Sequence, residues 1–304
     1  MKSSLRLCVL ILILSSYTSF SQDTTSVSDD DASTRPRSEK GFQVGFFTGV
    51  YYANKYNSQL YDGYGLNASG HKNDFVHSAM YQQIITYNGG YNGQTDRIAN
   101  ALGVQHGEWF FTESDMPVNL RYNIAFMVGV NMRYSMDKQS SFILNANTSK
   151  MTVNGDFTIV TQTLSNSGNA QPQQVKTFAL VGGEQRLLMQ LGYQQIFGED
   201  KLNFFIEGGA NITMAKFLKN QISVGSLVMD LSSIYYSYNW SAYRTKYLTG
   251  VGLGAFGGAG LNISVGSKWL MQFVYQPTYE YVKLGDAPKY TLNHAFGVRG
   301  YYTF

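Results

Sequence analysis

Cysteine is almost absent from this sequence of 304 residues: the single one, Cys8, lies in an apolar run near the start of the chain. That run, Leu7 to Leu14, follows a basic start and is followed by the small residues Ser19 and Ser21. It is too short to cross a membrane as a helix, and its flanks are those of a secretory signal. We therefore expect residues 1–21 to be a removed signal peptide, and the mature chain to have no disulfide and no cysteine-based metal site.

Charge, proline and long apolar runs are also scarce. Charged residues make up 14% of the chain, there are five prolines, and after residue 21 no apolar run approaches the ~20 residues of a transmembrane helix. A net charge of +3 is too weak to indicate nucleic-acid binding. Glycine (31), tyrosine (23) and phenylalanine (19) are abundant instead. This composition is typical of a membrane β-barrel, in which aromatics ring the interfaces and small side chains fit a narrow interior.

Catalytic and metal-binding motifs are missing as well. The four histidines, His71, His77, His106 and His294, show no metal-ligand spacing, and the chain has neither a Gly-x-Ser-x-Gly turn nor a phosphate-binding loop. We expect no catalytic residue, no metal and no cofactor, and a protein that is not an enzyme.

The last stretch, Tyr290 to Phe304, indicates what the chain is instead. Bulky apolar residues alternate there with small or polar ones, and a period of two predicts a β-strand. An exposed aromatic strand at a sheet edge invites aggregation, whereas a closed barrel has no edge. We therefore expect this strand to pair with the first one.

Alternation predicts eight strands, at residues 41–52, 120–134, 140–163, 176–197, 202–216, 248–265, 268–282 and 290–304. In the third, the apolar residues change parity between Leu144 and Val153, which predicts a bulge. Short links (136–139, 198–201, 266–267) alternate with long ones (53–118, 164–175, 217–247, 283–289). This asymmetry is typical of outer-membrane barrels, whose short turns are periplasmic. A soluble sandwich or lipocalin-like barrel would not show it.

The expected fold is therefore all-β, a transmembrane antiparallel eight-stranded up-and-down β-barrel over residues 41–304. A polar, flexible leader (residues 22–40) precedes it, and both termini lie in the periplasm. The first extracellular loop, about 53–118, is expected to be partly helical, with helices at Phe75–Tyr87 and Thr95–Leu102.

Two groups of side chains are candidate functional residues. Strand parity turns a mixed-sign set toward the lumen, where buried charges must be paired: Arg121, Arg133, Glu184, Arg186, Glu207 and Arg299, together with Glu280. The expected lumen is plugged, and a small-solute pore is the alternative. The loop at about 217–247 holds an aromatic cluster that suits either an interfacial girdle or a protein or glycan contact: Tyr235, Tyr236, Tyr238, Trp240 and Tyr243.

With a signal peptide, eight alternating strands and the ending Phe296-Gly-Val-Arg-Gly-Tyr-Tyr-Thr-Phe304, the chain resembles the OmpA/OmpX-like superfamily of small outer-membrane barrels. The resemblance implies that the barrel-assembly machinery reads Val298, Tyr302 and Phe304. Accessory barrels of type IX secretion and gliding machineries look similar. We expect a subunit of an outer-membrane assembly that contacts other outer-membrane or surface proteins through its loops, and no nucleic acid. A surface adhesin or glycan binder and a small-solute pore are the competing functions.

Overall fold

The computed structural model describes residues 41–67, 69–86, 94–162, 172–198, 202–232, 249–265, 268–284 and 288–303. The expected signal peptide (1–21) and leader (22–40) lie outside the described residues.

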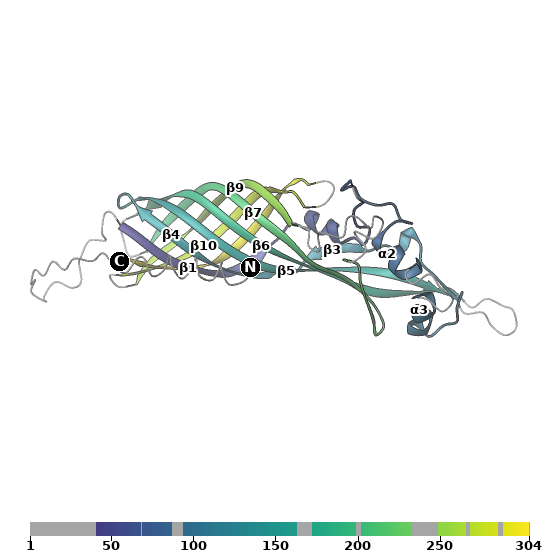
Figure 1. Ribbon diagram of the computed structural model, residues 1–304. Helices are drawn as coiled ribbons and strands as arrows, with labels where there is room; N and C mark the ends of the chain where they lie inside the picture. Colours follow the sequence, from purple (N-terminus) through teal and green to yellow (C-terminus); the bar gives the residue numbers. More distant parts are fainter. Residues whose placement is uncertain are drawn as a thin grey trace, which may run out of the picture. The chain divides into compact units, whose positions relative to one another are not determined.

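Eight strands close into a barrel (Figure 1). Antiparallel pairing runs from each strand to the next around the ring and returns from the last strand to the first. In ring order the strands are β1 (Gly41–Tyr52), β4 (Ala125–Ser135), β5 (Ser140–Thr161), β6 (Gln174–Phe197), β7 (Leu202–Val224), β9 (Thr249–Val265), β10 (Trp269–Val282) and β11 (Tyr290–Thr303). The all-β, eight-stranded antiparallel barrel expected from the sequence is confirmed.

The closing pair of strands is fitted around one aromatic ring. β1 and β11 pair without a shift from Gln43↔Thr303 to Tyr52↔His294, and Phe47 is buried between them. A Cβ atom on Gly297 would lie 2.5 Å from the Phe47 ring. Glycine at position 297 therefore leaves the space that the Phe47 ring occupies in the lumen.

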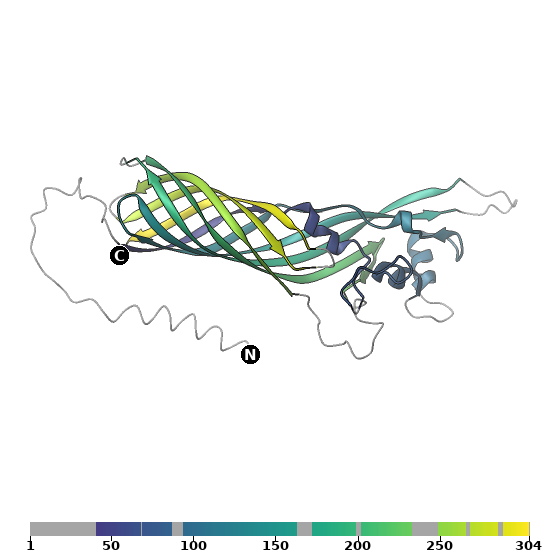
Figure 2. The same cartoon turned by 90° about the horizontal axis from the view of Figure 1, so that it is seen from above.

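Three strands continue beyond the barrel. β5, β6 and β7 are 22, 24 and 23 residues long, against 12 for β1 and 11 for β4. Figures 1 and 2 show them leaving the barrel together and passing beside the helices. Short strands widen this sheet: β2 (Trp109–Phe110) and β3 (Val118–Tyr122) pair with β5, and β8 (Leu227–Asp230) pairs with β7. The expectation that residues 217–230 belong to a loop was therefore wrong.

The bulge expected in the third strand is absent. β5 pairs with β6 in one register from Ser140↔Gln195 to Thr161↔Gln174. The apolar residues change face because the surroundings change: Phe142 and Leu144 point outward from the barrel, whereas Val153 and Phe157 point inward against the helices. The bulge lies in β7, where Leu218 is the extra residue between the pairs Gly183↔Lys219 and Glu184↔Phe217.

The second expected strand, residues 120–134, is two strands. β3 lies on the extended part of β5 and β4 lies in the ring, with Asn123 and Ile124 between them. The side chains of Tyr122 and Ala125, three residues apart, both turn inward. The alternation in the sequence continues through this break and so conceals it.

The segment between β1 and β4 folds into short elements. They are the 3-10 helix η3 (Lys55–Tyr61), α2 (Ala79–Tyr81) continued by the π-helix η4 (Gln82–Thr86), α3 (Gln94–Leu102), β2, the 3-10 helix η5 (Glu113–Asp115) and β3. The helix expected at Phe75–Tyr87 begins later, because Ser78 caps it by accepting a hydrogen bond from the Tyr81 N–H. The helix expected at Thr95–Leu102 is confirmed within one residue. No helix among the described residues is long and apolar enough to cross a membrane.

These elements pack on the extended sheet around a hydrophobic core that lies outside the barrel. They contribute Tyr61, Met80, Ile84, Ile98, Leu102, Trp109, Phe111 and Met116, and the sheet contributes Val153, Phe157, Ile159, Leu180, Phe217, Ile222 and Val224. We call this unit, the described residues of 53–122 with β8 and the extended parts of β5, β6 and β7, the head. It is a packed structure with its own core rather than a set of separate loops.

Candidate functional site

The outer face of the barrel is apolar. Large hydrophobic side chains on its strands are exposed, among them Phe126 (65%), Leu191 (62%) and Leu253 (60%). The inward face of the same strands is largely polar and buried. A soluble protein arranges these faces the other way, whereas a barrel in hydrocarbon requires an apolar exterior. The barrel therefore spans a membrane.

An aromatic belt marks the end of the barrel that carries the short turns. Cross-strand neighbours there are aromatic: Phe42↔Tyr134, Tyr134↔Phe142, Phe142↔Tyr193, Phe197↔Phe204 and Trp269↔Tyr302. At the other end, the outward face of β5 changes to polar at Lys150. The eight residue steps from Phe142 to Lys150 span about 26 Å along the strand at ~3.3 Å per step. At a tilt of roughly 40° this becomes about 20 Å across the membrane, close to the usual apolar height.

The middle of the lumen is filled by apolar side chains. Phe47, Met127, Met151, Leu188, Phe205 and Val274 belong to one buried cluster. Glycines of β9 make room for such side chains, since a Cβ on Gly260 would lie 2.7 Å from the Phe205 ring. The lumen is therefore packed at this level.

A buried ion pair lies among these apolar side chains, since Glu207 is two residues from Phe205 on β7 and Arg299 is the cross-strand partner of Phe47. Both guanidinium Nη atoms of Arg299 donate to Glu207, each at 2.7 Å. The Glu207 carboxylate also accepts from the side-chain amides of Gln194 and Gln276, both at 3.0 Å. A Cβ on Gly258 would lie 2.6 Å from Glu207 Cγ, so that glycine leaves the space the carboxylate occupies. All four lone-pair directions of the carboxylate are thus in use.

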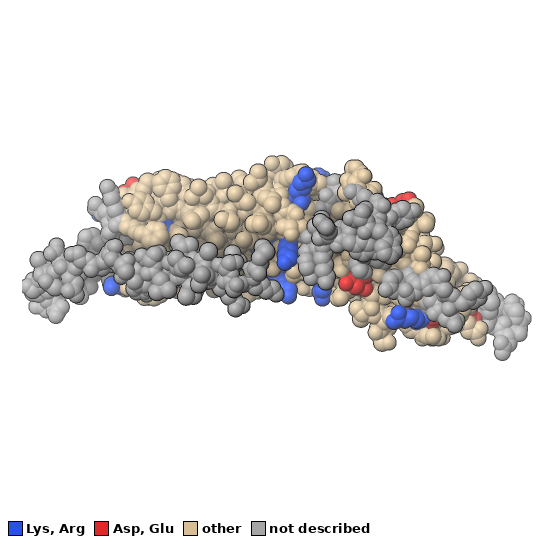
Figure 3. Space-filling model, in the orientation of Figure 1, with Lys and Arg blue, Asp and Glu red and all other residues tan. Residues whose placement is uncertain are grey.

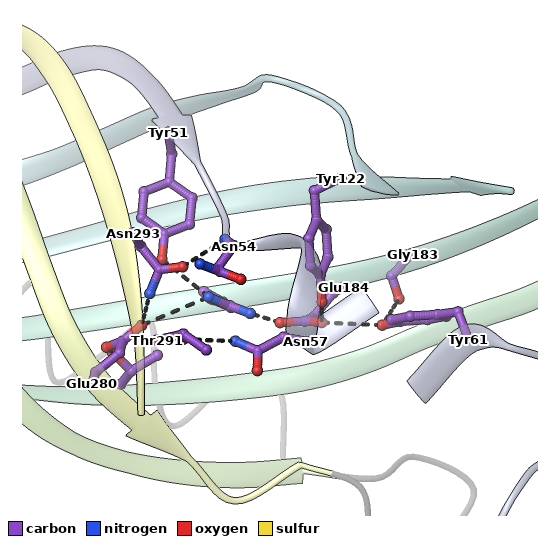
Figure 4. A network of polar contacts seen from close by, with 12 residues as sticks. Tyr51, Asn54, Asn57, Tyr61, Tyr122, Gly183, Glu184, Glu280, Thr291 and Asn293 are labelled. Carbon is purple, nitrogen blue, oxygen red and sulfur yellow. Dashed lines mark hydrogen bonds and ion pairs between the residues drawn. The ribbon is translucent and has the colours of Figure 1, made fainter. Parts of the chain in front are cut away.

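A larger polar network lies at the mouth of the barrel, on the head side (Figure 4). Arg186 is at its centre: its Nε donates to Glu184 at 2.6 Å, and its Nη1 donates to the Tyr51 hydroxyl at 3.1 Å and lies 3.7 Å from Glu280. Glu280 also accepts from Asn211 (2.6 Å), Asn293 (2.9 Å) and the Thr213 hydroxyl. All of these side chains are buried, so the network closes the barrel mouth.

The head is attached to this network through two tyrosines. The hydroxyls of Tyr122 and Tyr61 donate to Glu184, at 2.6 and 3.3 Å. The Tyr61 ring stacks on Phe217 with a centroid separation of 5.3 Å, and a Cβ on Gly182 would lie 2.3 Å from it. η3 is thereby fixed over the barrel mouth.

The structure places most of the sequence-derived lumen set in the interior. Arg133, Glu184, Arg186, Glu207 and Arg299 are buried, as is Glu280. Arg133 lies on the short-turn side, where its Nε donates to Ser141 at 2.9 Å. The placement of Arg121 in the lumen was wrong: it is exposed on β3, whose face is shifted by the break before β4.

Several residues of the mouth network were not singled out from the sequence. Tyr51 and Asn293 could have been found from strand parity, because each occupies an inward position on its strand, β1 or β11. Tyr61 could not, since it lies in a 3-10 helix with no periodic signal.

The remaining sequence-derived candidates lie elsewhere. Val298 and Tyr302 are on the outward face of β11. Phe304 and the aromatic cluster at residues 235–243 lie outside the described residues. Within the described part of the chain, no three His, Cys, Asp or Glu side chains gather as metal ligands would.

Described residues of the head line two hollows. One, of about 130 Å³, lies between η3 and the end of β10 and is lined by Tyr56, Leu60, Leu66 and Pro288, among others. The second, wider and more open, lies beside Phe75 and Glu113. Lys72 lines both, but its ammonium group is bound to Asp62 at 2.6 Å and lies 3.9 Å from the centroid of the Tyr64 ring. Neither hollow holds a set of convergent, unengaged polar groups.

No protein-family model matches the chain, and no curated protein matches it. Solved structures that resemble it include Neisserial surface protein A (8% identity, 87% of this chain and 97% of that one, TM-score 0.39). The attachment invasion locus protein Ail of Yersinia pestis is also similar (11% identity, 89% of this chain and 100% of that one, TM-score 0.33). So is OprG of Pseudomonas aeruginosa (10% identity, 88% of this chain and 97% of that one, TM-score 0.36). Sequence identities and TM-scores this low do not support any conclusion about function. By its closed ring, apolar exterior and polar interior, this chain is a small eight-stranded β-barrel of the outer-membrane type.

Proposed function

We propose that this protein is a non-enzymatic outer-membrane barrel that presents its head to other proteins, as an accessory subunit of an outer-membrane assembly. One observation carries the proposal: β5, β6 and β7 pass from the apolar band into the head without interruption, and the head has its own hydrophobic core. A barrel that served only as a membrane plug would not need such a unit. The short turns and both termini lie in the periplasm, and the head lies outside the cell.

The filled lumen favours a binding role over conduction. Apolar side chains fill the middle of the barrel, and buried, paired charges lie among them and at the mouth. An eight-stranded barrel has room only for its own side chains or one small ligand. Contacts with other molecules therefore belong on the outside of the head.

The tip of the head offers a surface for such contacts. Phe110, Val160 and Val175 are aligned across three neighbouring strands, on the face that points away from the head core. Phe110 is 38% and Val175 64% exposed. Aligned apolar side chains in water are characteristic of a protein interface. We place the main contact at this apolar tip.

The test is recovery of partners from gently solubilised membranes, using a tagged chain in its native host. The wild type is expected to copurify with a fixed set of outer-membrane proteins. The double variant Phe110→Lys/Val175→Lys should lose them while keeping heat-modifiable migration, which reports a folded barrel. Thr177→Lys adds one charge on the same face and should retain the partners.

Two results would overturn this function. One is a wild-type chain that is recovered alone but binds glycans, which would favour an adhesin. The other is steady, large openings of the purified protein in a planar bilayer, which would favour a pore.

A further inference from the structure

The apolar outward face of β5, β6 and β7 ends at a single row of polar residues. Lys150, Gln185 and Lys216 are direct cross-strand neighbours, and all three are exposed. On the barrel side of this row the outward residues of β6 and β7 are apolar, beginning with Leu187 and Met214. Strands ~4.8 Å apart separate the two lysine Cα atoms by about 10 Å. A pair of cations therefore lies where the hydrocarbon band ends.

The bulge in β7 adds a third cation to this place. Because Leu218 is the extra residue, Lys216 and Lys219, three apart, both point outward, while Phe217 between them is buried. Lys219 pairs with Gly183 in the next row, and a Cβ on that glycine would lie 3.0 Å from Lys219 Cγ. The lysine stem therefore lies across the glycine, toward β5.

On β5, β6 and β7 the outward residues from the lysine row to the row of Asn154 are uncharged apart from the lysines: Thr152, Asn154, Val181, Gly183 and Gln221. Two exposed carboxylates lie at the head-side edge of this group. Asp230 on β8 pairs with Gln221 and accepts hydrogen bonds from Ser232, and Asp156 is the next outward residue of β5 beyond Asn154. Arg121 pairs with Asn154 and is exposed, so it extends the positive surface onto β3. Figure 3 shows Lys and Arg side chains gathered where the uncharged surface of the barrel ends. We call Arg121, Lys150, Lys216 and Lys219 the basic patch.

We infer that the basic patch is a docking surface for the phosphorylated headgroups of lipids in the leaflet on the head side. The inference rests on the membrane placement proposed above, which fixes the depth of the patch. Lysine stems cover apolar wall while their ammonium groups reach the polar layer. Phosphate oxygens are the anions present at that depth, and each lysine near an anionic surface strengthens binding about fivefold. Three lysines and an arginine within two or three rows of the sheet suit a headgroup with more than one phosphate.

The experiment uses the full-length protein in nanodiscs of phosphatidylcholine with a minor fraction of diphosphorylated lipid A, or the same fraction of dephosphorylated lipid A. Native mass spectrometry after release counts the lipids retained by each barrel. The wild type is expected to retain the phosphorylated lipid at least tenfold over its bulk fraction, and the dephosphorylated lipid not at all. Lys150→Gln/Lys216→Gln/Lys219→Gln should reduce that enrichment to background.

A matched variant removes three cations outside the patch, Arg97→Gln/Lys138→Gln/Lys268→Gln, and should retain the lipid as the wild type does. Equal enrichment in the two triple variants would overturn the inference, as would loss of the lipid in millimolar inorganic phosphate, since the patch would then be a general anion site. Heat-modifiable migration and flotation with vesicles are measured in parallel. A chain that does not insert contradicts the proposed function itself, whereas a chain that inserts without enriching the lipid contradicts only this inference.

Discussion

Replacement of Arg299 by methionine should severely destabilise the barrel. Arg299 is fully buried, and Glu207, its bidentate partner, is 7% exposed. Methionine has a similar length but no charge, so the variant leaves a buried carboxylate with only the two glutamine amides as donors. Removing one member of a buried ion pair costs about 3–5 kcal/mol, and we expect this variant to lose that much free energy of unfolding.

The second arm of the test restores neutrality. In Glu207→Gln/Arg299→Met no charge remains buried at this site, because the glutamine amide replaces the carboxylate. The double variant should recover about 2 kcal/mol or more relative to Arg299→Met, because a neutral group carries a far smaller desolvation penalty than an unpaired ion. Arg121→Met, the same change at an exposed position, should cost no more than about 0.5 kcal/mol.

The assay is reversible urea unfolding in lipid vesicles, followed by the fraction with heat-modifiable migration and by the fluorescence of the three tryptophans of the chain. Reversibility is checked by refolding from urea. If Arg299→Met costs less than about 1 kcal/mol, or if the double variant is no more stable than the single one, the argument from an uncompensated buried charge is wrong.

Three further outcomes are expected. Gly182→Val should loosen the head without unfolding the barrel, because a Cβ there would lie 2.3 Å from the Tyr61 ring. Overpacking of this kind lowers the free energy of unfolding by about 1–3 kcal/mol. Limited proteolysis should therefore cut the head of the variant faster, while its heat-modifiable migration stays unchanged. Phe304→Asp should lower the amount of assembled barrel far more than partner binding per assembled barrel, measured on membrane fractions. Hydrogen bonds from the backbone, that of Gln139 first, lower the pKa of Asp137 in the turn between β4 and β5. This stabilisation is complete above the ordinary pKa of a carboxyl group and is lost as the pH falls through the lowered pKa of Asp137. The backbone amides of the turn should therefore lose protection from hydrogen exchange only in acid. Asp137→Asn should abolish that pH dependence.

The barrel could be predicted from the sequence because a strand between lipid and lumen has one apolar face. β1 and β11 show this alternation along their whole length, and their pairing follows from it. Strand parity also placed Glu207 and Arg299 on the same side of the wall, although on strands far apart in the sequence.

The head could not be predicted in the same way, because alternation shows which residues share a face but not what that face meets. In β5 the apolar face is the outer one up to Leu144 and the inner one from Met151 onward, where water replaces lipid outside. The parity change by itself predicts a bulge, although it marks the point where the strand leaves the membrane. Lys150, in the middle of a long alternating stretch, was the available signal.

The contact between η3 and the barrel mouth left no trace in the sequence. Tyr61 reaches Glu184 across 123 positions, and its site depends on the missing side chain at Gly182. A glycine inside a strand indicates that something approaches closely. It does not indicate which residue, because that depends on how the chain returns over the barrel.

The continuity of β5, β6 and β7 through the membrane boundary has a mechanical consequence. A head joined by flexible linkers would take up any orientation above the membrane, whereas this one continues three hydrogen-bonded strands of the barrel wall and has no hinge in them. From Lys150 to Thr161 the sheet extends about 36 Å along the strand at ~3.3 Å per residue. A partner at the apolar tip would therefore meet it at a fixed height and a fixed angle, and the protein would act as a rigid spacer that sets the distance between the partner and the membrane.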